Sequence, residues 1–395
     1  RGAVERELID RLNESVSMRT IADVPLGAFL SGGVDSSAVV AMMARADRRP
    51  SITTSIGFEE ARYNELPWAR RVAERYRTDH HEHIVRADAV DVVETLAWHY
   101  DEPFADYSAV PTYYVSKAAR EHVTVSLSGD GGDENFGGYR RYRFDLRERQ
   151  LRRRLPAWFR SGVLGPMASL YPKADWLPRV LRAKSTLANL AADEAEAYCR
   201  SVGFLDERAK ASMATAGVRR AVGAYSSVEV IRRHMARAGG EDLDRLIYTD
   251  FKTWLPDDML TKVDRASMAV GLEVRVPLLD HGFVEYARRV PGSMKIEGSQ
   301  GKAVLKSALE PYLDRELLYR SKQGFTPPLI EWLRGPLRPM MDDLLNGPDA
   351  FYADYLDRRA VGRAWRDHRT GLRNNAPLLW SVLMFELWGR RFVRG

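Results

Sequence analysis

The feature that most constrains the fold is a glycine- and serine-rich loop at residues 31–37, between a short apolar run and a helical pattern. The loop reads Ser-Gly-Gly-Val-Asp-Ser-Ser. Its glycines let the backbone approach a ligand closely, and the start of the following helix presents free N–H groups and a positive dipole end. The loop therefore predicts an anion-binding cradle. The alternative is a plain turn whose Asp and Ser side chains cap the helix.

An acid inside this loop narrows the expected chemistry. The usual phosphate-binding pattern, Gly-x-x-x-x-Gly-Lys-Ser/Thr, occurs nowhere in the sequence, so no loop lysine is available. The loop carries Asp35 instead, and a carboxylate beside phosphates is repulsive unless a cation lies between them. The hydroxyls of Ser31, Ser36 and Ser37 add hydrogen-bond donors. We therefore expect a phosphate site that also holds Mg²⁺.

Short apolar runs alternate with helical patterns over the first 140 residues. Strands are expected at residues 28–30, 52–58, 83–85 and 123–127, and helices at 37–45, 64–77, 87–100 and 113–121. This alternation predicts an α/β fold, in which a parallel sheet has helices on both faces. Ligands of such sheets bind at the carboxyl ends of the strands, where the loop at 31–37 begins.

The pattern changes after about Tyr142, where prolines become frequent and strand-like runs become scarce. Helices are expected at residues 225–237, 243–254, 301–309 and 377–392. We expect one large domain over residues 1–395. It would have a nucleotide-binding α/β core at about 20–142 and large helical C-terminal additions at about 143–395.

A second glycine-rich loop, at residues 128–138, follows the strand expected at 123–127. It places Asp130, Asp133 and Glu134 within five residues. Alone, such a loop could equally bind calcium or form a tight turn. Because the carboxyl ends of parallel strands meet at one sheet edge, we expect this loop to face the first one. Two acidic loops around one phosphate cradle suit Mg²⁺-dependent nucleotide chemistry.

Three further residue types invite a chemical interpretation. Lys322, in the loop at 321–328, could stabilise developing phosphate charge, although a lone lysine is more often a surface residue. Of the histidines at 80, 81 and 83, only His81 and His83 share a strand face, and no further residue completes a zinc set. The single cysteine, Cys199, cannot form an internal disulfide, which indicates a reducing, cytoplasmic compartment.

The formal net charge of +6 is concentrated in an arginine-rich stretch at residues 140–160. One interpretation is a surface for nucleic acid. The other, which we favour, is a solvated helix face whose arginine stems cover apolar surface. No apolar stretch approaches the ~20 residues of a membrane span.

These motifs together resemble a known family. The loop at 31–37 is similar to the pyrophosphate-binding loop of N-type ATP pyrophosphatases, and the loop at 128–138 narrows the resemblance to the synthetase domain of class B asparagine synthetases. Supporting segments lie at 101–106, 260–265, 273–280 and 321–328. The resemblance implies an adenine-nucleotide alpha-hydrolase-like fold and an ATP-dependent amide-forming ligase. In the best-known members L-aspartate is adenylated, pyrophosphate leaves, and ammonia then displaces AMP to give asparagine.

The resemblance also implies roles for individual residues. Pyrophosphate would be held by Ser31, Gly32, Gly33, Asp35, Ser36 and Ser37, the adenosine would be flanked by Phe29 and Ile56, and the nucleotide would contact Ser128 and Gly129. Asp35 and Asp133 would ligate Mg²⁺. Lys322 would stabilise charge on the α-phosphate. Asp130 would take part in proton transfer, although well-studied members carry the longer Glu at this place.

Full-length members of the family begin with a glutaminase domain whose N-terminal cysteine releases ammonia from glutamine. This chain begins with Arg-Gly and has no such cysteine. We expect it to be the C-terminal part of a longer protein, in which a glutaminase domain or subunit supplies ammonia. Free ammonia is the alternative source. We expect a small-molecule carboxylate as partner, no membrane and no nucleic acid, and a homodimer stays open.

Two other functions stay open. Residues 171–178 resemble amidotransferases linked to exosortase systems, which implies another acceptor carboxylate, such as a uronic acid in exopolysaccharide synthesis. An RNA-modifying ATP pyrophosphatase would use the arginine-rich stretch. Such enzymes usually add a pair of cysteines or an RNA-binding module, and one cysteine rules out the pair.

Overall fold

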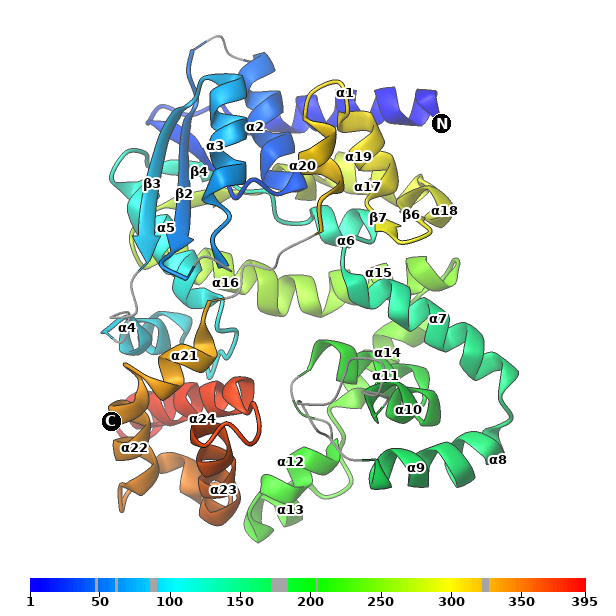
Figure 1. Ribbon diagram of the computed structural model, residues 1–395, viewed down its shortest axis with the longest axis vertical. Coiled ribbons are helices and arrows are strands. Elements are labelled where there is room, and N and C mark those ends of the chain that lie inside the picture. Colours follow the sequence, from blue (N-terminus) through cyan, green and yellow to red (C-terminus); the bar gives the residue numbers. More distant parts are fainter. Residues whose placement is uncertain are drawn as a thin grey trace. The chain divides into compact units, whose positions relative to one another are not determined.

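The computed structural model describes residues 1–46, 49–60, 63–85, 91–171, 184–203, 205, 207–321 and 327–395. The chain divides into two compact units, labelled by element in Figure 1, whose segments interleave along the sequence. Unit 1 comprises Arg1–Glu102, Asp106–Tyr139 and Leu255–Pro328. Unit 2 comprises Pro103–Ala105, Arg140–Trp254 and Leu329–Gly395. Residues 1–19 and 255–328 thus belong to the same compact unit as most of the residues 20–142 that were predicted to form the α/β core.

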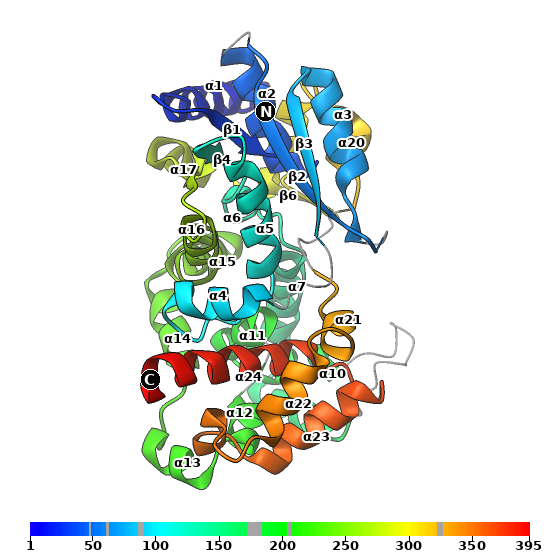
Figure 2. The same ribbon diagram turned by 90° about the vertical axis from the view of Figure 1, so that its left-hand side faces the viewer.

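Unit 1 is built on a five-stranded parallel sheet with the strand order β3-β2-β1-β4-β5. The strands are β1 (Leu26–Phe29), β2 (Ile52–Phe58), β3 (Asp79–Val85), β4 (Val125–Leu127) and β5 (Glu273–Arg275). Figure 2 shows β2 and β3 running side by side. The predicted parallel sheet and α/β class are confirmed.

Strands are scarce among the described residues after Tyr142, as expected, but one of them, β5, extends the sheet at its edge. Val125 of β4 pairs with Glu273, and the Ser128 amide donates to the Arg275 carbonyl over 2.8 Å. A three-residue strand has no measurable periodicity, so its sequence carries no signal. It becomes a strand because β4 offers unpaired backbone groups beside it.

Helices cover both faces of the sheet, as predicted. On one face, Ala28, Leu30 and Leu127 pack in a core with α1, α2, α3, α17, α19 and α20. On the other face, Phe29 and Ile52 pack against Ala119 of α5 and against Leu272. Ala28 and Phe29 face opposite sides because strand side chains alternate. The helical elements of unit 1 are α1 (Gly2–Arg19), α2 (Val34–Ala46), α3 (Leu66–Tyr76), α4 (Asp91–Tyr100), α5 (Ala109–Arg120), α6 (Gly132–Phe136), η4 (Leu255–Leu260), α16 (Thr261–Met268), η5 (Pro277–Leu279), α17 (His281–Arg289), α18 (Gly292–Lys295), α19 (Ala303–Leu309) and α20 (Arg315–Tyr319). The short strands β6 (Ile296–Glu297) and β7 (Gln300–Gly301) form a separate antiparallel pair.

The regular elements described in unit 2 are helices, as expected for the C-terminal additions, and an isolated antiparallel bridge joins Ala214 to Leu356. The helices of unit 2 are α7 (Arg140–Arg154), α8 (Ala157–Phe159), η2 (Arg160–Leu164), α9 (Gly165–Leu170), α10 (Lys184–Ala191), α11 (Glu194–Val202), α12 (Glu207–Met213), α13 (Ala216–Val222), α14 (Val228–Arg237), α15 (Asp242–Lys252), α21 (Leu329–Arg334), α22 (Arg338–Asn346), η6 (Phe351–Asp354), α23 (Arg358–Arg369), α24 (Ala376–Gly389) and η7 (Arg390–Arg394). Within the part of the chain that the structure describes, no helix is both long and apolar enough to span a membrane.

The arginine-rich stretch forms α7, and several of its arginines are internal to unit 2. Arg149 is buried and pairs with Glu194 over 2.9 Å. Arg152 is buried and donates to the Asn189 carbonyl over 2.8 Å. Arg141 contacts the fully buried Asp250 at 2.6 Å. The interpretation as a solvated helix face is therefore wrong for these three arginines, because two acids and one carbonyl of neighbouring helices bind their guanidinium groups.

Candidate active site

The loop at residues 31–37 turns from β1 into α2 and is closed by its own serines. The hydroxyls of Ser31 and Ser36 lie 3.0 Å apart, and the Gly33 amide donates to the Ser31 hydroxyl over 3.2 Å. Ser37 is buried, and its hydroxyl has no hydrogen-bond partner among the described residues. The turn leaves the first amides of α2 at the carboxyl edge of the sheet, as an anion cradle requires.

Gly32 fixes this loop against α3. Its φ of +69° lies in the left-handed region, and a methyl group there would approach the Ala69 nitrogen to 2.6 Å. Arg320 fastens the same point, since its guanidinium donates to the Gly32 carbonyl over 3.1 Å and to Glu65 over 2.6 Å. The same guanidinium lies 5.2 Å from the ring of Trp68. The loop is therefore held by two separate segments of unit 1, the start of α3 and the residue Arg320.

The two glycine-rich loops are in direct contact, as the sequence predicts. A methyl group on Gly129 would lie 2.5 Å from the Ser36 nitrogen and 2.9 Å from the Asp35 carbonyl carbon. Gly131 has a φ of +89° and lies against Leu279, which follows β5. The absence of side chains at these glycines lets the backbone of the second loop touch the start of α2.

The contact brings Asp35 and Asp133 to one cation, the side chain of Lys302. The Lys302 ammonium contacts Asp35 and lies 2.9 Å from the Asp133 carboxylate. Only 7% of the Lys302 side chain is exposed. Burial alone would lower the pKa of Lys302, but Asp133 and Asp35 outweigh it and raise the pKa well above its ordinary value. The Lys302 ammonium therefore lies between the two predicted metal ligands.

These carboxylates fit Mg²⁺ in a particular way. Among the described residues, no group of three or more His, Cys, Asp or Glu side chains is arranged to hold a metal ion. A pair of carboxylates is nevertheless the protein ligand set that Mg²⁺ commonly uses when substrate phosphates complete its shell. Glu134, the third acid of the second loop, instead accepts the Tyr139 hydroxyl over 2.6 Å. Asp35 and Asp133 are thus the pair that would hold Mg²⁺ together with phosphate oxygens.

Asp130 lies beside a second buried ionic cluster of unit 1. Its carboxylate accepts the Ser128 hydroxyl. Nearby, the Lys262 ammonium lies 3.1 Å from Asp106, and Asp258, Asp106 and Asp130 all raise the pKa of Lys262 against the effect of its burial. Burial and then Asp106 raise the pKa of Asp258 to about 7. The predicted proton-transfer residue therefore lies within the electrostatic influence of Lys262, which is paired with Asp106.

The remaining predicted residues stand as follows. Ile56 is buried in β2, and Phe29 is partly buried on the face of the sheet that α5 covers. Lys322 lies outside the described residues.

The histidines and the cysteine show no sign of a chemical role. His81 stacks on His122 with ring centroids 3.6 Å apart, which is no arrangement for a shared metal ion. Burial raises the pKa of Cys199 to about 11, so this thiol is unreactive near neutral pH.

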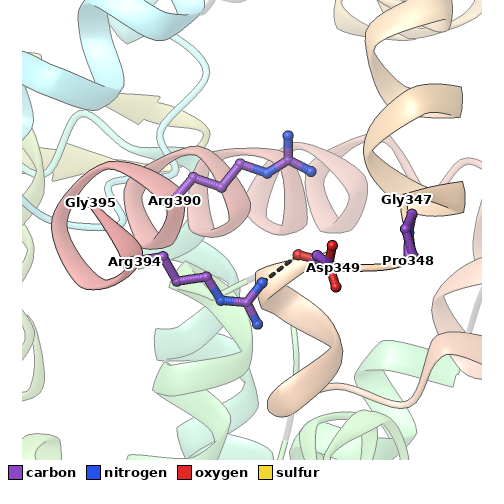
Figure 3. Close-up of a pocket in the computed structure, with 6 residues that line it drawn as sticks. All are labelled: Gly347, Pro348, Asp349, Arg390, Arg394 and Gly395. Carbon is purple, nitrogen blue, oxygen red and sulfur yellow. Dashed lines mark hydrogen bonds between the residues drawn. The ribbon is translucent and has the colours of Figure 1, made fainter.

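A separate pocket of about 370 Å³ lies in unit 2, and Figure 3 shows the six residues that line it. They are Gly347, Pro348, Asp349, Arg390, Arg394 and Gly395. Arg394 donates to the Asp349 carbonyl, and Arg390 donates to Glu386 over 2.6 Å. The pocket contains none of the predicted site residues.

Sequence reasoning missed Lys302, Arg320 and the role of Lys262. Lys302 falls at the start of a helix expected from its apolar spacing, and nothing in that spacing indicates carboxylate partners. Only Lys262 had a signal in the sequence, because it lies in the supporting segment at residues 260–265 and its partner Asp106 ends the supporting segment at 101–106. These two segments mark the family, but the sequence does not indicate that they form an ion pair.

Comparison with known proteins decides the family. Residues 7–390 match the family model described as asparagine synthase. The chain belongs to the asparagine synthase family. It is 29% identical over 386 residues to asparagine synthetase [glutamine-hydrolyzing] 1 of Bacillus subtilis (strain 168), covering 97% of this chain and 58% of that protein. It is 34% identical over 401 residues to a putative asparagine synthetase [glutamine-hydrolyzing] of Mycobacterium tuberculosis (strain ATCC 25618 / H37Rv), covering 98% and 58%.

The chain is also similar to a protein with a different kind of name. The chain is 26% identical over 431 residues to amidase chyE of Penicillium rubens (strain ATCC 28089 / DSM 1075 / NRRL 1951 / Wisconsin 54-1255), covering 97% of this chain and 61% of that protein. The chain thus spans about three fifths of the length of these curated relatives. Relatives that match nearly the whole of this chain are therefore named both as asparagine synthetases and as an amidase.

Proposed function

We propose that this chain is the synthetase part of an ATP-dependent amide-forming ligase, and that its favoured acceptor is L-aspartate. The observation that carries the proposal is the contact of the two glycine-rich loops. Gly129 lies against the backbone at Ser36, and Lys302 joins Asp35 to Asp133. One cradle of amides and one pair of carboxylates then face the same triphosphate, which is the arrangement that nucleotide activation needs.

In the first half-reaction the acceptor carboxylate attacks the α-phosphorus of ATP, and the bond to the β-phosphate breaks. The leaving pyrophosphate would be held by the amides at the start of α2 and by the hydroxyls of Ser31, Ser36 and Ser37. Mg²⁺ held by Asp35 and Asp133 would neutralise phosphate charge. Lys322 follows Arg320 by two residues, and Arg320 donates to the Gly32 carbonyl over 3.1 Å. We assign Lys322 to the charge on the α-phosphate.

In the second half-reaction ammonia attacks the carbonyl carbon of the acyl-adenylate. The new C–N bond forms, the C–O bond to phosphate breaks, and AMP leaves with the electron pair. The nitrogen must then lose one proton. Asp130 is the assigned acceptor, because its carboxylate lies in the second loop beside the Ser128 hydroxyl that it binds. Glutamine hydrolysis by a further domain or subunit would supply the ammonia.

The test is ATP–pyrophosphate exchange, which reports adenylation without ammonia. The acids to compare are L-aspartate, other amino acids and uronic acids, followed by amide formation with ammonium. Asp35→Ala is expected to abolish exchange, since it removes a carboxylate from the metal pair. Asp10→Ala is the matched control, because Asp10 is exposed on α1.

The results of the exchange assay with different acids distinguish the proposed function from its alternatives. Exchange with a uronic acid but not with aspartate would keep the ligase and change its acceptor. RNA-dependent AMP release with no exchange on any acid would favour RNA modification. Folded protein that shows neither activity would overturn the proposal.

A further inference from the structure

Lys302 is set between the two loops by tight backbone packing. It immediately precedes α19 with a φ of +57°, a left-handed conformation that is uncommon for a residue with a side chain. Its amide donates to the Phe136 carbonyl over 3.0 Å. A methyl group on Gly138 would lie 2.2 Å from the Lys302 Cε, and one on Gly301 would lie 2.5 Å from the Gly137 carbonyl oxygen. The lysine stem therefore runs in a channel with little room to move.

The charge balance at the end of this channel is simple. One ammonium lies between two carboxylates, Asp35 and Asp133, and the side chains of all three are mostly buried. The lysine already supplies one positive charge at the place where Mg²⁺ would bind. A divalent ion entering this pair alone would gain two ligands but would lie close to a cation in a poorly solvated site.

We propose that Lys302 makes metal binding depend on the nucleotide: it neutralises the Asp35–Asp133 pair in the free protein, so that Mg²⁺ enters with the triphosphate and not before it. The inference rests on the proposed function, because it uses the two carboxylates assigned there to Mg²⁺. A bound triphosphate brings several negative charges. It gives the ammonium and the metal ion separate oxygens to bind, which removes the conflict between them.

The matched control for this idea lies on the next turn of the same helix. Lys306 is also a buried lysine and lies within α19, but its ammonium lies 3.1 Å from the Gln300 side-chain oxygen and 5.6 Å from the ring centre of Tyr319. Lys306→Met therefore removes the same charge from the same helix without changing the pair of carboxylates. Lys302→Met removes the charge from that pair.

The experiment measures Mn²⁺ binding to the full chain without nucleotide, by electron paramagnetic resonance of the free ion. Lys302→Met is expected to bind Mn²⁺ at least about tenfold more tightly than the wild type, because the competing cation is gone. Lys306→Met is expected to match the wild type. Equal Mn²⁺ affinity in folded Lys302→Met and wild type would overturn the proposal.

A second measurement needs no variant, in case Lys302→Met does not fold. Calorimetry of the wild type is expected to show no binding of Mg²⁺ alone below about 1 mM. Mg²⁺ is expected to tighten binding of α,β-methylene-ATP by at least about tenfold. Tight binding of Mg²⁺ alone would contradict the role of Lys302. Failure of the proposed function gives a different result, namely no binding of the ATP analogue and no ATP–pyrophosphate exchange.

Discussion

Gly129→Ala is expected to separate the two loops of the site. The added methyl group would lie 2.5 Å from the Ser36 nitrogen, whereas ordinary contact begins at 3.4 Å. The backbone of one loop must therefore retreat by about 0.9 Å, since the methyl group would also lie 3.0 Å from the Asp35 Cβ and 2.9 Å from its carbonyl carbon. No flexible side chain can absorb this shift. Overpacking of this kind costs about 1–3 kcal/mol of stability.

The larger effect of Gly129→Ala is expected on activity. A misplacement of about 1 Å can lower the rate about 10²-fold, and here it separates Asp35 from the loop that carries Asp133. The assay is ATP–pyrophosphate exchange, with thermal unfolding measured in parallel. Gly362→Ala is the control, because Gly362 lies within α23 with no atom within 4 Å of the added methyl group. If Gly129→Ala keeps exchange within about twofold of the wild type, the close contact of the loops is not what builds the site.

Two further predictions concern unit 2. Burial, reinforced by Glu148, raises the pKa of Asp145 to about 6 against the effect of Arg141. Because this folded-state pKa exceeds the unfolded value near 3.8, folding favours the protonated acid, and stability falls as the pH rises from about 4 through 6 by up to about 3 kcal/mol. Asp145→Asn is expected to remove that fall when melting temperatures at about pH 5 and pH 8 are compared, and an unchanged fall would contradict the assignment. Asp250, fully buried, accepts the hydroxyls of Tyr142 and Tyr198 and pairs with Arg141. Asp250→Asn is expected to cost about 3–5 kcal/mol in urea unfolding, and a loss below about 1 kcal/mol would show that the pair contributes little.

The local part of the fold was predictable from sequence because it depends on near neighbours. The periodicity of α3 and of β2 is visible within a dozen residues, and the loop at residues 31–37 combines a strand end, glycines and a helix start in one short stretch. The first cradle therefore needed no tertiary information. Its contact with the loop at 128–138 followed from one general rule, that parallel strands end at the same edge of a sheet.

The features that could not be predicted from the sequence depend on contacts between residues that are distant in the chain. β5 is a strand because β4 lies beside it, and three residues carry no period of their own. From the sequence alone, the arginines of α7 are predicted to form a charged surface. In the structure, three of them contact Asp250, Glu194 and the Asn189 carbonyl.

Lys302 is the sharpest case of this limit. Its spacing predicts only a helix, and its partners Asp35 and Asp133 come from two other elements. Electrostatic interactions depend on the distance between charged groups, and only the folded chain decides which charged side chains lie close together. The sequence by itself determined the strand–loop–helix at residues 26–46, in which a phosphate cradle is predicted, and it determined the family. The tertiary structure decided that a buried lysine already lies between the two predicted metal ligands.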